Sequence, residues 1–391
     1  MELVIIDGAR TPFGKFGGGL KDVSSVQLGV LAAEEAIRRS GVNKEEIDHV
    51  VFGNVVQAGA DAPYLARHIG IRSGIPIETP ALTVNRLCGS GLQAVVNAAQ
   101  QILLGESRLV LAGGSENMSQ IPYVLPNARW GYRMGDHKAV DMMTAALVDS
   151  CAQVAMSDTA ENLAEEYGIS REAQDEYAFR SQQAAAKAIA SGRMAKEIVS
   201  VELNDKRQTV ISQDEHPRET TLEKLSSLKA SFRKNGTVTA GNASGINDGA
   251  AALMVTTAQA AKEMGVDPIA RIKSWASVGV PPEKMGIGPA PAIEKALQRA
   301  NLKLSDLDII EVNEAFAAQY LAVEKALGLD RDKVNVNGGA IALGHPLGAS
   351  GARVLLTAMY EMLEQQKRYG VASLCIGGGQ GIAMIVENAR L

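Results

Sequence analysis

The chain has 391 residues, of which 46% are hydrophobic and 21% are charged, a composition typical of globular proteins. At about 100–200 residues per domain, this length predicts two or three domains. The net charge of −5 argues against nucleic acid as the main partner. No apolar run approaches the roughly 20 residues that a membrane span needs, so we expect no membrane partner.

The N-terminal residues and the cysteines indicate the compartment. Residues 3–6 form an apolar run that stops at Asp7, which fits a first strand and is too short for a signal peptide. Cys88, Cys151 and Cys375 form neither an even disulfide framework nor a Cys-x-x-Cys metal spacing. We therefore expect a cytoplasmic protein with thiol chemistry and no metal site. Cys151 matches no motif and is interpreted as a packing residue.

The first 118 residues alternate between predicted strands and helices. The predicted strands are 3–6, 50–53, 79–84 and 109–112, and the predicted helices are 27–40 and 92–104. Alternation of this kind predicts a parallel or mixed sheet covered by helices.

A long insertion is predicted to interrupt this α/β pattern. Residues 119–243 contain a helical stretch at 157–191 that is rich in Ala, Glu and Gln. A strand at 250–256 and a helix at 258–264 then resume the earlier pattern, and a second α/β series begins near Ile269. The predicted domains are an N-terminal half (1–118 plus 244–267), an inserted loop domain (119–243) and a C-terminal half (268–391).

The second series repeats the first at an offset of 260 residues. Residues 32–54 align without gaps with residues 292–314, and five of the aligned positions are identical. At the same offset Cys88 aligns with Gly348, and Asn85 aligns with His345. Leu87, Ser90 and Gly91 align with Leu347, Ser350 and Gly351. This is a duplicated α/β unit, and its two equivalent strand-to-helix turns predict one shared site.

Cys88 lies where the apolar strand 79–84 is predicted to turn into the helix that follows. Unpaired backbone N–H groups and the positive end of the helix dipole favour a thiolate at such a position. We therefore expect the pKa of Cys88 to lie below its usual value of about 8.5. A small buried cysteine at a tight turn is the structural alternative.

Three more residues with catalytic chemistry fall near predicted strand ends or turns. His345 lies in a glycine-bordered turn and could act as the base for a nearby thiol, or it could be a loop residue with satisfied hydrogen bonds. Cys375 precedes the glycines 377–379, whose N–H groups can face a ligand oxygen. Asn313 offers an amide that could hold a water or a carbonyl, or could cap the next helix.

Five motifs together resemble those of the 3-ketoacyl-CoA and acetoacetyl-CoA thiolases, across essentially the whole chain. They lie at 85–91, 241–245, 313–316, 344–346 and 375–379. The resemblance implies a thiolase-like α/β fold of two duplicated αβαβα layered halves, with helices between the sheets and an inserted loop domain. It also implies an enzyme of fatty acid β-oxidation that joins acyl-CoA to acetyl-CoA reversibly and cleaves 3-ketoacyl-CoA by thiolysis.

The same resemblance implies a role for each catalytic residue. Cys88 would be the acylated nucleophile, His345 would activate it, and Cys375 would remove and return the α-proton. Asn313 would bind a water in one oxyanion hole. The N–H groups of Cys88 and Gly377 would form a second oxyanion hole.

The resemblance further implies a site for coenzyme A. Coenzyme A and acetyl-CoA would be substrates, and no cofactor would be bound permanently. Leu147, Arg218 and Ser244 match positions that bind coenzyme A in the family. Met156 would lie at the thioester end, and Phe316 would flank the acyl pocket.

Residues 119–141 carry aromatic and basic side chains and resemble the tetramerisation loop of the family. We therefore expect a homotetramer, built as a dimer of dimers.

One departure from the family concerns substrate length. Ala155 precedes Met156, at the position where biosynthetic acetoacetyl-CoA thiolases have His. The thioester end of the site is therefore more apolar, which favours a degradative enzyme. The alternatives are a strictly short-chain acetyl-CoA C-acetyltransferase, a carrier-protein condensing enzyme and an inactive acyl-CoA-binding protein. Cys375 argues against the condensing enzyme, which normally lacks a second catalytic cysteine. Cys88 and Cys375 also permit a redox switch if their Cα atoms lie within roughly 7 Å.

Overall fold

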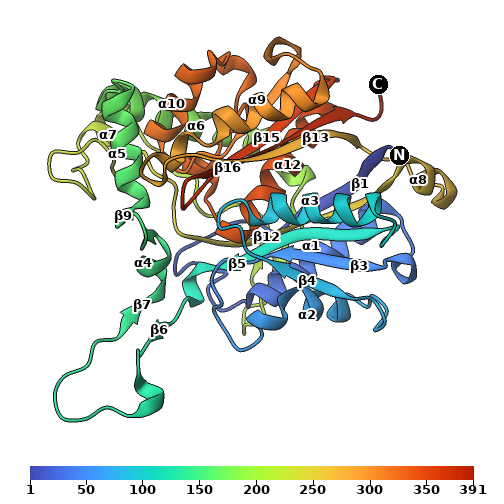
Figure 1. The fold of residues 1–391 in the computed structure, drawn as a ribbon, viewed down its shortest axis with the longest axis horizontal. Helices are drawn as coiled ribbons and strands as arrows, with labels where there is room; N and C mark the ends of the chain where they lie inside the picture. Colours follow the sequence, from blue (N-terminus) through green and yellow to red (C-terminus); the bar gives the residue numbers. More distant parts are fainter.

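The computed structural model describes residues 1–391, and its two halves share one mixed sheet (Figure 1). In the N-terminal half, β3 runs parallel to β4 and β5, and β12 runs antiparallel to β5 and β1. In the C-terminal half, β14 runs parallel to β15, and β16 runs antiparallel to β15 and β13. The strands are β1 (Leu3–Arg10), β2 (Gly14–Lys15), β3 (His49–Gly53), β4 (Ala81–Val84), β5 (Val110–Asn117), β12 (Asn247–Thr257), β13 (Ala270–Gly279), β14 (Ile309–Val312), β15 (Tyr369–Ile376) and β16 (Gln380–Asn388).

The two halves meet where β1 pairs with β13, so that the sheet order is β14-β15-β16-β13-β1-β12-β5-β3-β4. The topology of the two halves is repeated. At the 260-residue offset β3 corresponds to β14 and β5 to β15, and β12, which follows the insertion, corresponds in its place in the sheet to β16. The expected duplicated α/β architecture is therefore confirmed.

Helices lie in three layers around the two halves of the sheet. The middle layer is α3 (Ser90–Leu103) and α12 (Leu347–Glu364), whose apolar residues form one core with strands of both halves. On the outer faces, α1 (Ser25–Ser40) and α2 (Leu65–Arg72) cover the N-terminal half. The C-terminal half is covered by α9 (Pro289–Ala300) and α10 (Ala317–Leu327). Two shorter helices are α8 (Ala258–Met264) and α11 (Ala340–Leu343).

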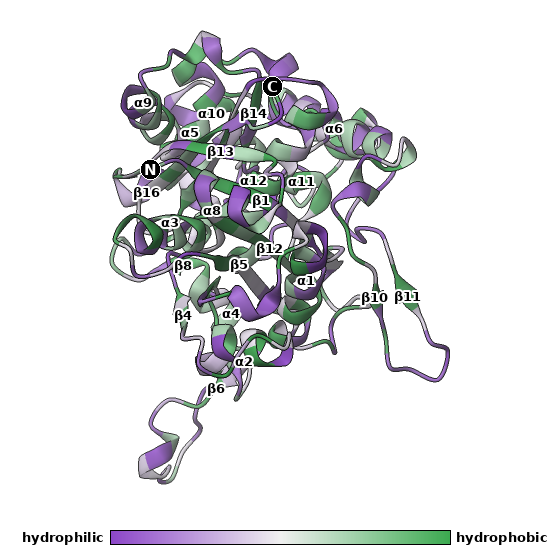
Figure 2. Ribbon diagram, turned by 90° about the vertical axis from the view of Figure 1, so that its right-hand side faces the viewer, coloured by the Kyte–Doolittle hydropathy of each residue, from purple (hydrophilic) through white to green (hydrophobic).

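The insertion contains helices and three small hairpins, and two of these hairpins project from the body (Figures 1 and 2). The elements are β6 (Tyr123–Val124), β7 (Val140–Asp141), α4 (Met142–Ala146), β8 (Val148–Asp149), β9 (Val154–Ala155), α5 (Met156–Glu166), α6 (Arg171–Ala190), β10 (Val201–Glu202), β11 (Val210–Ile211) and α7 (Leu222–Ser226). The helical stretch expected at 157–191 is thus two helices, because the chain turns at Gly168, which has a positive φ of 56°. The division at residues 118, 243 and 267 stays a prediction.

No helix of the protein combines the length and the apolar character that crossing a bilayer would require.

Candidate active site

The predicted catalytic residues come from both halves and lie around the middle helix layer. Cys88 lies between β4 and α3, and His345 lies between α11 and α12. Asn313 directly follows β14, and Cys375 is the penultimate residue of β15. The equivalent turns of the duplicated unit therefore lead to the N-terminal ends of two helices that pack against each other.

The turn that carries Cys88 is fixed by side-chain hydrogen bonds. Asn85 Oδ1 accepts the N–H of Leu87 at 2.9 Å, and Ser90 Oγ donates to the Leu87 carbonyl at 2.6 Å. Leu87 has a φ of 46°, a left-handed conformation that costs a non-glycine residue about 1–3 kcal/mol. The surrounding bonds hold this strained bend. Cys88 lies two residues before α3 begins, and so is not in the first helical turn.

The expected low pKa of Cys88 is wrong for this structure. Burial raises the pKa of the thiol to about 11, because the charged form would lose its water. The backbone N–H groups of Gly377 and of Cys88 itself bond to the sulfur and lower this pKa, while the carboxylate of Glu116 raises it. The free thiol is therefore neutral, and its activation requires a base.

His345 has a ring nitrogen that can accept a proton. Its Nδ1 atom lies 2.6 Å from Oγ of Ser350, and this hydroxyl donates its own proton to the carbonyl of Pro346 at 2.7 Å. The serine oxygen therefore accepts from Nδ1–H, and this assigns the tautomer in which Nε2 is unprotonated. Burial lowers the pKa of His345 to about 3, so the imidazole is neutral and able to take a proton.

Asn313 faces His345 and does not cap a helix. Its side-chain Nδ2 lies 3.4 Å from His345 Nε2, and its buried Oδ1 has no hydrogen-bond partner. The next helix, α10, begins at Ala317 with Phe316 as its N-cap residue, so the capping alternative is wrong. A buried amide with a free oxygen beside the imidazole can hold a water or a ligand group.

Cys375 is buried next to Cys88. It packs against Met285 and Ala315, and the partly buried side chains of Met156 and Phe316 cover this cluster. Burial, followed by the neighbouring Cys88, raises the pKa of Cys375 well above its usual value. A thiolate formed there would be a strong base in an apolar setting.

Gly377 leaves room between these groups. A Cβ atom at this position would lie 3.1 Å from Leu87 Cδ1 and 3.3 Å from Met156 Sδ. The absence of a side chain therefore keeps its N–H accessible to the sulfur of Cys88.

The residues expected at coenzyme A lie on linked segments. The N–H of Ser244 donates to the carbonyl of Ala315 at 3.0 Å, beside the bridge between Ala243 and Phe316. The N–H of Met156 donates to the carbonyl of Leu147 at 2.9 Å. These contacts bring the insertion and the loop at 241–245 to the apolar cluster around Cys375.

Arg218 is exposed, and its Nη2 donates to the carbonyl of Ala240 at 2.7 Å. It therefore lies on the outer side of the same loop. Cys151 is exposed as well, so its interpretation as a packing residue is wrong.

Sequence reasoning missed two buried polar residues that position the site. Glu116 accepts the N–H groups of Val55 and of Gly348, each at 2.9 Å. Asn247 Oδ1 accepts the N–H of His345 at 2.9 Å. Neither residue belongs to a motif, because the partners are distant in the sequence.

Comparison with known families gives two matches that cover nearly the whole chain. Residues 3–259 match the family described as thiolase, N-terminal domain, and residues 266–388 match thiolase, C-terminal domain. The chain is 52% identical over 392 residues to the acetyl-CoA acetyltransferase of Syntrophomonas wolfei, covering 99% of each protein. It is 51% identical over 390 residues to the beta-ketothiolase BktB of Cupriavidus necator, again covering 99% of each.

Solved structures are also similar to this chain over nearly its whole length. Human mitochondrial 3-ketoacyl-CoA thiolase superposes with a TM-score of 0.97 at 49% identity, covering 99% of this chain and 98% of that one. The same human enzyme in complex with CoA superposes equally well.

Proposed function

This chain belongs to the thiolase family of CoA-using acyltransferases, and we propose that it transfers acyl groups between CoA and acetyl-CoA through a Cys88 acyl-enzyme. The observation that supports this most directly is the tautomer of His345. Its Nδ1 is bonded to Ser350, and its unprotonated Nε2 lies 3.4 Å from the amide nitrogen of Asn313. A neutral thiol with a pKa of about 11 requires such a base.

In the first half-reaction, His345 Nε2 takes the proton of Cys88 Sγ, and the sulfur attacks the thioester carbonyl of an acyl-CoA. The N–H groups of Cys88 and Gly377, which bond to the sulfur at rest, are the donors for the developing oxyanion. The carbonyl–sulfur bond to CoA breaks, the Cys375 thiol donates its proton to the leaving CoA thiolate, and His345 keeps the proton of Cys88. Because one thioester replaces another, the step is reversible.

In the second half-reaction, the Cys375 thiolate removes an α-proton from acetyl-CoA. The enolate oxygen accepts hydrogen bonds from Nε2–H of the His345 imidazolium and from a water held by Asn313, and the α-carbon attacks the acyl carbonyl on Cys88. A carbon–carbon bond forms, and Cys88 leaves as the thiolate and takes its proton back from His345. The raised pKa of Cys375 suits a weakly acidic carbon acid, since a strong base is needed. Thiolysis of 3-ketoacyl-CoA is the same sequence reversed.

We infer that the acyl pocket accepts chains longer than acetoacetyl. Ala155 is small and only partly buried, and the side chains that pack next to Cys375, those of Met156, Met285 and Phe316, are all apolar. Apolar surroundings of this kind favour the degradative direction, with 3-ketoacyl-CoA as substrate.

The ratio of kcat/KM for a medium-chain 3-ketoacyl-CoA to that for acetoacetyl-CoA tests this substrate range. We expect the longer substrate to be cleaved at least as well. The Ala155→His variant should lower kcat/KM for the longer substrate more than for acetoacetyl-CoA. Cleavage of acetoacetyl-CoA alone by the unaltered enzyme would instead identify a short-chain acetyl-CoA C-acetyltransferase.

We further propose a homotetramer, with CoA and acyl-CoA as the only small-molecule partners. The arm between β6 and β7 projects from the body (Figure 1) and exposes large apolar side chains. Trp130 is 83% exposed and Met134 is fully exposed, as an assembly contact would require. Light scattering of a variant with both replaced by Ser should give dimers, and an unchanged mass would exclude this role of the arm.

A further inference from the structure

The Arg218 segment (residues 216–220) is held to the rest of the protein by a single backbone hydrogen bond. In this bond the N–H of Arg218 donates to Oε1 of Gln182 at 3.0 Å. The Arg218 side chain is exposed and donates to the carbonyl of Ala240 at 2.7 Å. An exposed guanidinium suits the phosphate groups of coenzyme A, because it can donate to two oxygens at once. The place of this cation therefore depends on Gln182 and on that one side-chain bond.

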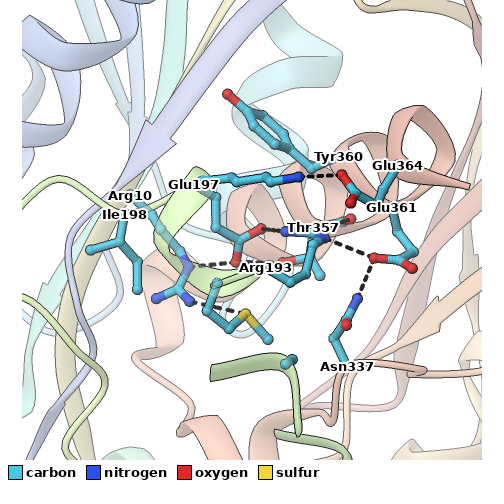
Figure 3. A network of polar contacts seen from close by, with 12 residues as sticks. Arg10, Arg193, Glu197, Ile198, Asn337, Thr357, Tyr360, Glu361 and Glu364 are labelled. Atoms are coloured by element: carbon cyan, nitrogen blue, oxygen red, sulfur yellow. Dashed lines mark hydrogen bonds and ion pairs between the residues drawn. The ribbon is translucent and has the colours of Figure 1, made fainter. Parts of the chain in front are cut away.

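The chain on either side of the Arg218 segment is anchored more firmly. Before it, Asp214 accepts from Arg10 at 2.6 Å, and Figure 3 shows Arg10 in the buried polar network that reaches α12. The N–H of Glu215 donates to the carbonyl of Phe13 at 2.9 Å. After the segment, Thr221 is the N-cap residue of α7. Only the residues in between rely on a partner in α6, the long helix of the insertion.

That partner, Gln182, is a buried residue of α6 that uses both ends of its amide. Its side chain is 5% exposed. Its Oε1 accepts from Arg218, and its Nε2 donates to the carbonyl of Ile341 at 3.2 Å. The orientation of the amide follows from these partners, because a backbone N–H can only donate and a carbonyl can only accept. One side chain thus connects the Arg218 segment to α11.

The bond to Ile341 completes the end of the helix that leads to His345. A longer helix would pair the Ile341 carbonyl with the N–H of His345, four residues further on. That N–H bonds instead to Oδ1 of Asn247 at 2.9 Å. The carbonyl is left without its helical partner, and Gln182 is the donor that satisfies it. Gln182 therefore contacts the chain four residues before the proposed base.

α11 is also held by bonds that do not involve Gln182. Ser181, the preceding residue of α6, donates from Oγ to Oε2 of Glu314 at 2.7 Å. The same carboxylate oxygen accepts the N–H of Ile341 at 3.2 Å. Loss of the Gln182 amide would therefore release the Arg218 segment much more than it would release α11 and the base that follows.

We propose that Gln182 is a positioning residue that sets the distance between the cation for coenzyme A and the catalytic base. The proposal rests on the proposed use of CoA thioesters, with Arg218 at coenzyme A and His345 as the base. A CoA thioester is long, so contacts at its nucleotide end orient the reacting carbonyl only if the two sites keep a fixed spacing. A thioester without the nucleotide does not use this spacing.

The test compares the acetylation rate of Cys88 with acetyl-CoA and with acetyl-pantetheine, which lacks the nucleotide. Peptide mass spectrometry after acid quenching measures both rates. Gln182→Met removes both hydrogen bonds at a similar side-chain volume. We expect its rate with acetyl-CoA to fall by about five- to tenfold, as the loss of one hydrogen bond can cause. The rate with acetyl-pantetheine should stay nearly the same, because the supports of α11 remain.

Gln174→Met is the matched control. Gln174 is a buried glutamine of the same helix, and its Nε2 donates to Oγ1 of Thr237 at 2.9 Å, away from both connected segments. This variant should leave the ratio of the two acetylation rates unchanged. A folded Gln182→Met enzyme with an unchanged ratio would overturn the proposal, and so would an equal change of the ratio in Gln174→Met.

Hydrogen exchange of the unaltered protein tests the contact itself. This measurement decides alone if Gln182→Met does not fold or if acetyl-pantetheine reacts too slowly. The N–H of Arg218 should exchange more slowly than those of Glu219 and Thr220, which have no hydrogen-bond partner within the protein. Equally fast exchange at the three positions would show that Gln182 does not hold the segment, and would overturn the proposal.

Arg218→Ala separates this proposal from the proposed function. If that variant keeps the full rate with acetyl-CoA, Arg218 does not bind coenzyme A, and the role of Gln182 fails while the acyl-enzyme on Cys88 stands. If Arg218→Ala lowers the rate and Gln182→Met does not, only the role of Gln182 is excluded. If the unaltered enzyme is not acetylated on Cys88 at all, the proposed function fails and this proposal fails with it.

Discussion

The Nδ1 atom of His345 lies 2.6 Å from the Oγ atom of Ser350, the residue that aligns with Ser90 in the other half of the chain. Ser90 bonds to the backbone of Leu87 and fixes the turn of Cys88. The same serine of the duplicated unit thus holds the turn of Cys88 in one half and the imidazole of His345 in the other. On the proposed mechanism, divergence of one repeated turn has produced the nucleophile and its base.

Replacing Ser350 with Ala removes the acceptor for Nδ1–H, so the imidazole is free to rotate or to change tautomer. We expect kcat for thiolysis to fall by about 10- to 100-fold with KM nearly unchanged, less than the 10²–10⁴-fold that a general base contributes, because the imidazole itself remains. Steady-state kinetics measures both constants. Ser274→Ala is the matched control, because that buried serine likewise donates to a backbone carbonyl, that of Ala296 at 2.7 Å. Equal effects of the two substitutions would contradict the orienting role.

Gly91 allows α3 and α12 to approach each other. A Cβ atom there would lie 2.7 Å from the backbone nitrogen of Ala352 and 2.8 Å from the carbonyl oxygen of Gly348. Gly91→Ala should push the helices apart and displace Cys88 from His345. We expect kcat/KM to fall by about 10²-fold, as a displacement of about 1 Å can cause. Gly59→Ala, where nothing lies within 4 Å, should leave kcat/KM unchanged, and an active Gly91→Ala enzyme would refute the close approach.

Arg10 joins β1 to the insertion through a buried ion-pair network. It bonds to Glu197 and Asp214, and its side chain is fully buried. Arg10→Met leaves Asp214 without its cation and Glu197 with Arg193 alone, at 3.3 Å, and such a loss costs about 3–5 kcal/mol of unfolding free energy. Urea denaturation measures this change. Arg368→Gln at the exposed pair with Glu387 should cost far less, because exposed ion pairs contribute little, and a similar loss for both variants would exclude a special role of the buried network.

The pH dependence of stability follows from the buried histidines. Burial lowers the pKa of His216 to about 4, so between pH 6.5 and 4 the unfolded chain binds a proton there and the folded chain does not. The free energy of unfolding therefore falls as the pH drops through this window. We expect the unaltered protein to lose about 1.5 kcal/mol more than His216→Asn between pH 6.5 and 5. Urea titrations at both pH values measure the difference, and parallel losses would place the histidine in solvent.

Local patterns in the sequence were enough to predict the duplicated architecture. The apolar spacing after Cys88 and its repeat after Gly348 gave α3 and α12, because helix periodicity is set by neighbouring residues. The shared offset also placed Cys88 and His345 at equivalent turns, and the structure brings these turns together. Short glycine-rich motifs likewise predicted the strand ends, because a turn is determined by residues that are adjacent in the sequence.

Features that depend on distant partners were not predictable in this way. The pKa of Cys88 is raised because elements from the other half bury the thiol, an effect that outweighs the local backbone dipoles. Glu116 bonds to Gly348 across 232 positions of sequence, and Asn247 bonds to His345 across 98. A hydrogen bond between residues so far apart in the sequence leaves no periodic pattern from which it could be predicted. The capping alternative for Asn313 failed likewise, because the amide is turned toward His345 from the opposite segment.

The central claim, an acyl group carried on Cys88, is tested most directly by the mass of the intact protein after brief incubation with acetyl-CoA and acid quenching. We expect the gain of one acetyl group per chain, mapped by peptide mass spectrometry to Cys88, and no gain for Cys88→Ala. His345→Asn should slow the labelling without moving it to another residue. An acetyl group on Cys375, or thiolytic turnover by Cys88→Ala, would contradict the account.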